Sequence, residues 1–283
     1  MDKAPTPIVS VIIPTYQAER TLSACLKSIQ EQTCPPDEVI VVDAGSADNT
    51  AAIARSFGVT FLSTTPNRSA QRNLGAQASG GDYLLFIDAD MILSPVVIEE
   101  CVGYSLRHPD TAGLVIPEQS FGETFWAHVK AFERSFYQGV DYMEAARWMP
   151  KSIFMKVGGY DPVLLGGEDW DLDERLRQQG PIGRVAAVIR HDEGALTLHR
   201  LQYKKHHYAD TLPTYAARYP KRAAKQLSLR KRTKLFAAKP CRLLRHPGLS
   251  LGLAIMAAAE LTAIWKEPNG ADNPLIVEQV HHE

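Results

Sequence analysis

Short apolar runs recur along the first third of the chain. Each is rich in β-branched or aromatic residues, and each predicts a strand: residues 9–14 (VSVIIP), 38–43 (EVIVVD), 59–63 (VTFLS) and 83–88 (YLLFID). Because the runs are almost continuously apolar and do not alternate with polar residues, they are typical of strands buried on both faces.

The stretches between these runs have helical spacing. Three helices are predicted there, over Leu22, Cys25, Leu26 and Ile29, over Ala51, Ile53, Ala54 and Phe57, and over residues 69–79. Asp48 stands where the N-cap of the second helix is expected. Strands that alternate with helices indicate βαβ units, and so an α/β fold with a doubly wound, mostly parallel sheet flanked by helices.

The second half of the chain has a weaker pattern. It predicts a helix over 95–107, a strand over 112–118, a helix over 124–140 with Phe125, Val129, Phe132 and Phe136 on one face, turns and acidic residues over 149–173, a helix over 169–179, helical structure over 197–238, and a last apolar stretch from Pro247. No internal repeat or low-complexity tract interrupts this order.

Composition places the chain among ordinary globular proteins. Of its 283 residues, 45% are hydrophobic and 22% are charged, which excludes a disordered, collagen-like or disulfide-stapled chain. The cysteines Cys25, Cys34, Cys101 and Cys241 have no zinc-binding spacing and are interpreted as reduced thiols of a cytosolic protein. The first apolar run is too short for a signal peptide, so none is expected.

The net charge of −1 conceals a strong asymmetry. Residues 1–198 carry 16 Lys and Arg against 26 Asp and Glu, whereas residues 199–246 carry 14 Lys and Arg against one acidic residue, Asp210. Such segregation indicates a basic arm that faces an anionic partner. A solvated helix surface is the alternative.

Candidate chemistry is sought where predicted strands end, because ligands of such sheets bind beyond the carboxyl ends of the strands. Asp88 and Asp90 come directly after the strand at 83–88, and two carboxylates at this spacing can reach one Mg²⁺ or Mn²⁺ ion. Two turn-forming aspartates are the alternative. Asp43, Gly45 and Ser46 form a polar turn before a helix, which can approach an anion, but it matches neither a dinucleotide-binding fingerprint nor a P-loop.

Two further groups of residues lie outside these turns. Glu168, Asp169 and Trp170 follow a pair of glycines, so a carboxylate there can serve as a general base and the indole can stack on a sugar or base. Acidic residues that favour the first turn of a helix are the alternative. Arg68 and Arg72 share a helix face and can contact a diphosphate, or Arg72 can form a surface ion pair.

Together these segments resemble glycosyltransferase family 2, the large inverting family with the GT-A fold. The resemblance rests on SVIIPTYQAERTLSACLKSIQEQT, DEVIVVDAGSADNT, RSAQRNLGA, GDYLLFIDAD and GGYDPVLLGGEDWDLDERL, in one order, and covers about residues 8–194. It implies a GT-A catalytic domain over 1–198, with a nucleotide-sugar half over about 8–94 and an acceptor half over about 95–198. A helical basic and apolar extension would follow over 199–283.

The resemblance also implies roles for individual residues. The residues expected to bind the nucleotide sugar are Pro14, Thr15, Tyr16, Glu19, Asp43, Arg72 and Asp88. Ala44 departs from the family's usual DDGS or DSGS only at its variable second position. Asp90, together with Asp88, would hold Mn²⁺ or Mg²⁺, and His191 resembles a histidine that borders the donor phosphates in some relatives. Asp169 would be the general base, with Glu168 and Trp170 on the acceptor side.

The implied function is inverting transfer of a sugar from a nucleotide diphosphate sugar, with UDP expected, to a hydroxyl of a glycan or a lipid-linked acceptor. The alternatives are a sugar-1-phosphate nucleotidyltransferase, which would need a Gly-rich basic loop after the first strand, and a non-catalytic binder of membranes or nucleic acid. Retained carboxylates at positions 88, 90 and 169 argue against a pure binder, and no nucleic-acid partner is expected. The enzyme is expected in the cytoplasm, peripherally bound to the inner face of the membrane. Whether it forms a homo-oligomer stays open.

The length of the last apolar stretch indicates whether the chain could span a membrane or only bind to its surface. The uncharged run from Pro247 to Ala259 is 13 residues long and ends at Glu260, whereas crossing a bilayer takes about 20 apolar residues. A helix lying at an anionic membrane surface, with Trp265 at its edge, is one interpretation. A helix that packs on the catalytic body or forms a dimer contact is the other.

Overall fold

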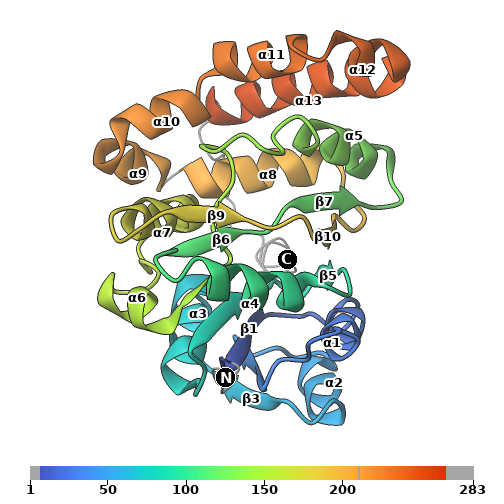
Figure 1. Cartoon of the computed structure of the whole chain (residues 1–283). Coiled ribbons are helices and arrows are strands. Elements are labelled where there is room, and N and C mark those ends of the chain that lie inside the picture. Colours follow the sequence, from blue (N-terminus) through green and yellow to red (C-terminus); the bar gives the residue numbers. More distant parts are fainter. Residues whose placement is uncertain (1–6, 210, 266–283) are drawn as a thin grey trace.

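A seven-stranded sheet forms the centre of the molecule (Figure 1). The computed structural model describes residues 7–209 and 211–265, and side chains within this range except those of 204–209 and 260–265. The strands of this sheet are β3 (Thr60–Ser63), β2 (Glu38–Asp43), β1 (Val9–Thr15), β4 (Tyr83–Phe86), β8 (Trp148–Pro150), β6 (Gly113–Val115) and β9 (Ile182–Arg184), in that spatial order.

Most neighbours in this sheet run parallel. β1 lies between β2 and β4, parallel to both, so that Thr15 is paired with Asp43 and Ile12 with Phe86. β8 is the exception, because it runs antiparallel to β4 and to β6. The α/β fold with a doubly wound, mostly parallel sheet is therefore confirmed, and β8 was missed.

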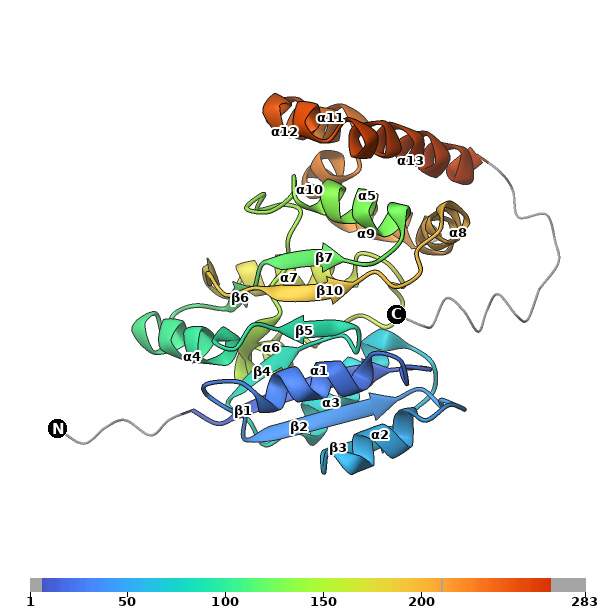
Figure 2. The same ribbon diagram turned by 90° about the vertical axis from the view of Figure 1, so that its right-hand side faces the viewer.

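A second, three-stranded sheet lies above β1 and β4 in Figure 2, at the height of β6. Its order is β5 (Met91–Leu93), β10 (Ile189–Asp192) and β7 (Glu118–Phe121), with β10 antiparallel to β5 and parallel to β7. The sequence pattern predicted none of these strands. The pairing brings His191 opposite Met91, directly after Asp90.

Helices cover both faces of the large sheet. They are α1 (Leu22–Gln30), α2 (Thr50–Ser56), α3 (Arg68–Ala78), α4 (Val97–Arg107), α6 (Lys151–Lys156) and α7 (Glu168–Arg177), whereas α5 (Phe125–Arg134) packs on β7 of the small sheet. Because side chains alternate along a strand, Val11 and Ile13 pack in the core with α1 and α4, whereas Ile12 packs with α3, α6 and α7. This packing of two cores fixes where each strand ends.

Several predicted helix limits are corrected. The N-cap of α2 is Asn49, and Asp48 instead accepts hydrogen bonds from the amide and hydroxyl of Thr50. α5 ends at Arg134, earlier than the predicted helix over 124–140, and its Phe125 is exposed although Val129, Phe132 and Phe136 are buried.

Prolines divide the C-terminal part into short helices. They are α8 (Leu198–Ala209), α9 (Leu212–Arg218), α10 (Pro220–Gln226), α11 (Leu229–Ala237), α12 (Pro240–Arg245) and α13 (Pro247–Trp265). Proline is tolerated in the first turn of a helix, where its missing N–H has no intrahelical partner, but not in the interior. Residues 197–238 are therefore helical as predicted, but in separate pieces.

α13 packs on α5 and α8 (Figures 1 and 2). Its Leu253 and Met256 are buried in one cluster with Val129, Phe132 and Phe136. In the described part of the chain, no helix combines the length and apolarity needed to cross a membrane. The side chain of Trp265, expected at a membrane edge, and residues 266–283 lie outside the description.

Candidate active site

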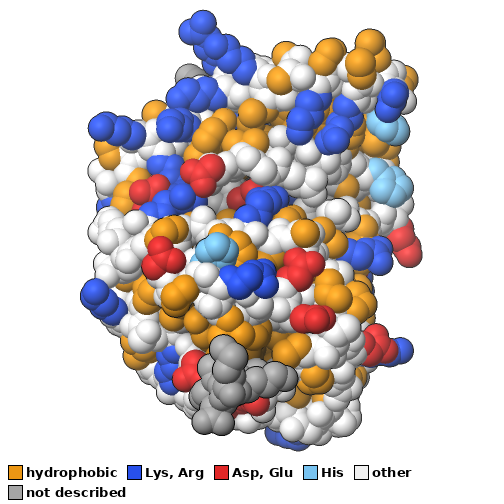
Figure 3. All heavy atoms as spheres, in the orientation of Figure 1, with side chains coloured by type: hydrophobic (Ala, Val, Ile, Leu, Met, Phe, Trp, Pro, Cys, Tyr) orange, Lys and Arg blue, Asp and Glu red, His pale blue; other side chains and the backbone are white. Residues whose placement is uncertain are grey.

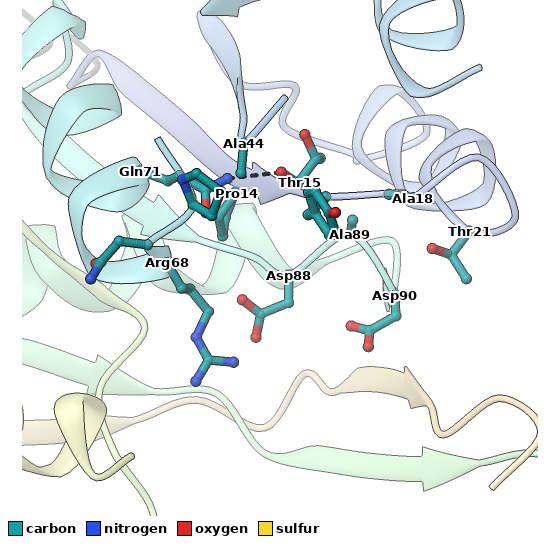
Figure 4. Close-up of a pocket in the computed structure, with 13 residues that line it drawn as sticks. Pro14, Thr15, Ala18, Thr21, Ala44, Arg68, Gln71, Asp88, Ala89 and Asp90 are labelled. Atoms are coloured by element: carbon teal, nitrogen blue, oxygen red, sulfur yellow. Dashed lines mark hydrogen bonds between the residues drawn. The ribbon is translucent and has the colours of Figure 1, made fainter. Parts of the chain in front are cut away.

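A pocket opens where β1, β2 and β4 end, as the sheet topology requires (Figure 4). The residues that line it are Pro14, Thr15, Tyr16, Ala18, Thr21, Ala44, Pro66, Asn67, Arg68, Gln71, Asp88, Ala89 and Asp90. Figure 4 shows the carboxylates of Asp88 and Asp90 side by side below the strand ends, with the Arg68 guanidinium next to them. Pro14, Thr15, Tyr16, Asp88 and Asp90 are thus placed together, as expected.

Asp43 lies behind the pocket wall and shapes it. Its buried carboxylate accepts hydrogen bonds from the hydroxyls of Thr15 and Ser46 and from the amides of Gly45 and Ser46, at 2.6–2.9 Å. Gly45 has a φ of +83°, a left-handed conformation that glycine adopts without strain. The carboxylate therefore holds the turn after β2, and Ala44 is the residue of this turn that lines the pocket.

Gln71 was missed by the sequence analysis. Its buried side-chain amide donates to the carbonyls of Thr15 at 2.8 Å and of Val42 at 2.7 Å. One side chain on α3 thereby fixes the ends of β1 and β2 relative to each other. A polar residue on the sheet-facing side of an amphipathic helix was the available signal.

Arg72 joins the two acidic motifs. Its Nη2 donates to Asp88 Oδ1 at 2.6 Å, and its Nη1 donates to Asp169 Oδ1 at 2.9 Å. The side chain is fully buried and lies over the ring of Tyr160, 4.9 Å from the centroid. Arg72 is therefore a buried link between residues far apart in sequence, and the interpretation as a surface ion pair is wrong.

The charge of Asp88 is set by its arginines. Burial raises the pKa of Asp88, but Arg72 and Arg147 outweigh that effect and hold it well below its usual range. The opposite holds at Glu168, where burial and the neighbouring Asp169 raise the pKa although Arg68 donates to Glu168 at 2.6 Å. Asp169 is the more accessible of the two acids, with 34% of its side chain exposed.

Asp90 differs from Asp88 because arginine does not neutralise it. Its Oδ2 lies 3.1 Å from His191 Nε2, and its Oδ1 is buried with no hydrogen-bond partner. Nδ1 of His191 lies 2.6 Å from Arg134 Nη1. Burial lowers the pKa of His191, but Asp90 outweighs that effect and raises the pKa to about 10, so Nε2–H donates to Asp90. Asp90 therefore presents one oxygen without a partner beside the pocket.

A second layer of charge lies behind Asp88, and sequence reasoning missed it. Arg147 Nε donates to Glu118 at 2.6 Å, and Arg147 Nη2 lies 3.4 Å from Asp88 Oδ2. Arg147 Nη1 and Arg72 Nε are, like Asp90 Oδ1, buried atoms without a hydrogen-bond partner. Because buried polar atoms are usually satisfied, this concentration of unpaired atoms at one site is unusual.

Two expected residues lie elsewhere. The exposed carboxylate of Glu19 accepts from the amide and side chain of Asn49 at the start of α2, and Glu19 does not line the pocket. Trp170 packs against Tyr215, 5.8 Å between ring centroids, and donates from its indole to the carbonyl of Met143. Both side chains support neighbouring elements in this structure.

The carboxylates at the pocket supply only part of the ligands that a divalent cation needs. In the residues that the structure describes, no group of three or more His, Cys, Asp and Glu side chains is arranged to hold a metal ion. The unpaired Asp90 Oδ1, with His191 beside it, offers a partial site of the kind that substrate phosphates complete.

Comparison with known proteins adds the family. The family described as "Glycosyl transferase family 2" matches residues 10–162, which include the sheet edge and the pair Asp88 and Asp90. This chain belongs to glycosyl transferase family 2. This match supports neither the nucleotidyltransferase nor the non-catalytic alternative.

Curated relatives of this glycosyltransferase have varied names. It is 37% identical over 178 residues to a PGL/p-HBAD biosynthesis glycosyltransferase of Mycobacterium bovis, covering 60% of this chain and 69% of that one. It is 29% identical over 222 residues to a validoxylamine A glucosyltransferase of Streptomyces hygroscopicus, covering 62% and 49%. With an O-antigen chain rhamnosyltransferase of Salmonella typhimurium the identity is 26% over 207 residues, covering 65% and 66%. This chain therefore spans from about half to slightly more than two thirds of the length of these three relatives.

Solved structures agree on the fold. Residues 1–349 of TarS from S. aureus, in complex with UDP, match with a TM-score of 0.54 at 15% identity, covering 90% of this chain and 88% of that one. The UDP-GlcNAc complex of the same protein matches with a TM-score of 0.52 at 16% identity, covering 72% and 66%. This glycosyltransferase therefore has the GT-A fold.

Proposed function

We propose that this glycosyltransferase transfers a sugar from a nucleotide diphosphate sugar to an acceptor hydroxyl, with inversion of the anomeric configuration. The observation that carries the proposal is the buried Arg72, which connects Asp88 at the pocket with the half-exposed Asp169. This link fixes a basic carboxylate at a set position relative to the donor site.

Asp169 is the general base of this proposal. An acceptor hydroxyl is a weak nucleophile, so the carboxylate takes its proton as the oxygen attacks the anomeric carbon. The bond from that carbon to the diphosphate oxygen breaks on the opposite side, and the nucleoside diphosphate leaves with the electron pair. A single displacement inverts the configuration and needs no carboxylate nucleophile.

The departing diphosphate gains negative charge, which the site is suited to bind. The Arg68 guanidinium lines the pocket beside Asp88, where it would donate hydrogen bonds to phosphate oxygens. Asp90, with its unpaired Oδ1, would hold Mn²⁺ or Mg²⁺ together with the diphosphate, and His191 would position the Asp90 carboxylate. When bound, such an ion stabilises negative charge on the leaving group.

Uridine is the proposed base of the donor. The turns after β1 and β2, including Pro14, Thr15 and Tyr16, line the pocket beside the carboxylates. TarS, which shares the fold, has been solved with UDP and with UDP-GlcNAc, and this supports the same nucleotide here. Asp43 would act by holding the turn that faces the base, since its oxygens accept hydrogen bonds from that turn.

A glycan or lipid-linked hydroxyl is the proposed acceptor. Two relatives are named for an O-antigen chain and for PGL/p-HBAD biosynthesis, which supports this class of acceptor. Glu168, buried beside Asp169 and paired with Arg68, would shape the acceptor side. We propose a cytoplasmic enzyme that works at the inner face of the membrane.

A thermal-shift panel with UDP-, GDP- and dTDP-sugars, with and without Mn²⁺, tests the donor. A ligand that binds the folded state raises the melting temperature by mass action. We expect UDP-sugars to give the largest increase, and a larger one with Mn²⁺. If no nucleotide sugar shifts the transition, the proposed donor class is wrong; a retained anomer in the product, detected by NMR, would contradict the inverting step.

A further inference from the structure

The C-terminal helices carry an exposed surface that the catalytic proposal does not use. This C-terminal surface consists of α11, α12 and the outer face of α13, which form one end of the molecule in Figures 1 and 2. Residues 211–259 include no Asp or Glu. Figure 3 shows Lys and Arg side chains along this upper end, with hydrophobic side chains among them.

The cations of helices α9 to α12 divide into two kinds. Arg218, Arg222 and Arg232 form ion pairs with acidic residues of the body, such as Arg222 with Asp173 at 2.7 Å. Other cations form no ion pair in the part of the chain that the structure describes: Lys221, Lys225, Arg230, Lys231, Lys234, Lys239, Arg242 and Arg245. Lys225 lies over the ring of Tyr142, and Lys239 and Arg242 lie over the ring of Phe136, but no carboxylate neutralises these cations in the described residues.

Three of them converge on one hollow. Lys239, Arg242 and Arg245 line it together with His246. Arg242 also donates to the carbonyl of Ser135, which fixes α12 against the end of α5. Three cationic residues around one hollow form a site whose charge suits a phosphate group.

An apolar stripe accompanies these cations. Leu251 and Ile255 are 64% and 43% exposed, and with the exposed Ala254 and Ala258 they recur at helical spacing along α13. Leu244, between two of the cations of the hollow, is 80% exposed. The opposite side of α13 is buried on α5, so the exposed side is not needed for the core.

From these observations we propose that the C-terminal surface attaches the enzyme to a membrane that contains anionic lipids. Leu244 and the α13 stripe would enter the boundary between headgroups and acyl chains, while the unpaired cations contact headgroup phosphates. One side of α13 packs on the body, as one interpretation of the last apolar stretch predicted, and the other side would bind lipid.

Two other occupants fit less well. A second copy of the chain in a two-fold contact would bring the same patch, with its unpaired cations, against itself and create repulsion. Nucleic acid would use the cations but leaves no place for exposed aliphatic residues such as Leu244 and Leu251. A surface that combines both features matches an anionic membrane.

Vesicle co-sedimentation of the full chain tests the proposal. We expect the enzyme to sediment with phosphatidylcholine vesicles that contain about one third phosphatidylglycerol, weakly with phosphatidylcholine alone, and less as NaCl rises from about 0.1 to about 0.5 M. Two double variants should each lower the partition coefficient about tenfold or more. The first combines Lys239→Glu with Arg245→Glu, and the second combines Leu244→Ser with Leu251→Ser. Lys156→Glu and Leu106→Ser, exposed changes on α6 and α4, are the matched controls and should bind as the wild type does.

Transfer to a water-soluble acceptor separates this proposal from the proposed function. Variants of the C-terminal surface should keep wild-type melting and wild-type soluble transfer while losing vesicle binding. Absence of wild-type binding to anionic vesicles would overturn the proposal, and so would binding that both double variants retain. A dimer in solution that Leu244→Ser with Leu251→Ser dissociates, without vesicle binding, would assign the surface to self-association instead.

Discussion

The pocket edge and the C-terminal surface both concentrate charge, but they do so in opposite ways. At the pocket, Arg72 and Arg147 are buried and each contacts more than one carboxylate. At the C-terminal surface, Lys239 and Arg245 lie beside solvent and have no acidic neighbour in the described structure. Buried and paired charge fixes geometry, whereas unpaired surface charge attracts a partner.

The largest expected effect comes from breaking the buried link. Arg72→Met should destabilise the protein by about 3–5 kcal/mol, because Asp88 and Asp169 would lose their shared cation. Urea unfolding at neutral pH measures this. The control Lys27→Met, which removes a surface pair with Glu31 whose side chains are 69% and 62% exposed, should change stability by less than about 1 kcal/mol. Equal losses in the two variants would contradict the distinction between the regions.

Asp90→Asn tests the second carboxylate of the pocket. It should weaken Mn²⁺-dependent binding of UDP by about 10- to 100-fold, since it removes a charged oxygen that has no other partner. Titration calorimetry with and without Mn²⁺ measures the change. We expect a smaller loss of stability than in Arg72→Met, because the Asn side chain can still accept a hydrogen bond from His191 Nε2. Unchanged UDP affinity in Mn²⁺ would rule out Asp90 as a ligand.

A smaller, pH-dependent effect is expected where the two regions meet. Glu133 on α5 is buried and pairs with Lys130 and with Arg232 of α11. Burial raises the pKa of Glu133, but these cations outweigh it and hold the pKa below its usual value. The pair therefore contributes stability above the pKa of the unfolded chain, and this contribution is lost as the pH falls.

Glu133→Gln should remove this dependence. We expect a loss of about 1–3 kcal/mol at pH 7 and a smaller loss near pH 4, where part of the wild-type advantage has gone. Urea unfolding of both proteins across this range is the measurement. A difference that does not shrink on acidification would show that Glu133 does not titrate with folding.

The sequence predicted the central strands and missed the short ones for a physical reason. β1 and β2 are continuous apolar runs, and this composition predicts strands that are buried on both faces. β5 and β8 are three residues long, and their pairing with β10 and with β4 is decided by distant segments. No local periodicity can report such a pairing.

Part of the candidate site could also be predicted from the sequence. Asp88, Asp90 and Asp169 stand in short motifs, so local sequence locates them. Arg147 and Gln71 carry no motif, and only burial beside their partners identifies them. Family resemblance gave Glu19 a role at the nucleotide and Trp170 a role on the acceptor side, and both roles stay predictions. In the structure their side chains contact Asn49 and Tyr215.

The basic arm, residues 199–246, also shows that sequence alone does not identify the partners of charged residues. Its charge predicted an anionic partner, yet Arg222 and Arg232 bind acidic residues of the protein itself. Composition counts every cation equally, and only the structure separates those that fasten the helices from those left exposed.

Asp169→Asn most directly tests the claim that a carboxylate fixed by Arg72 acts as the base. Sugar transfer and UDP-sugar binding are measured on the same preparation, with Asp110→Asn, on an exposed loop, as the matched control. The account predicts that transfer falls by about 10²- to 10⁴-fold while donor affinity and the melting temperature stay near those of the control. Transfer close to the wild-type rate in Asp169→Asn would contradict it.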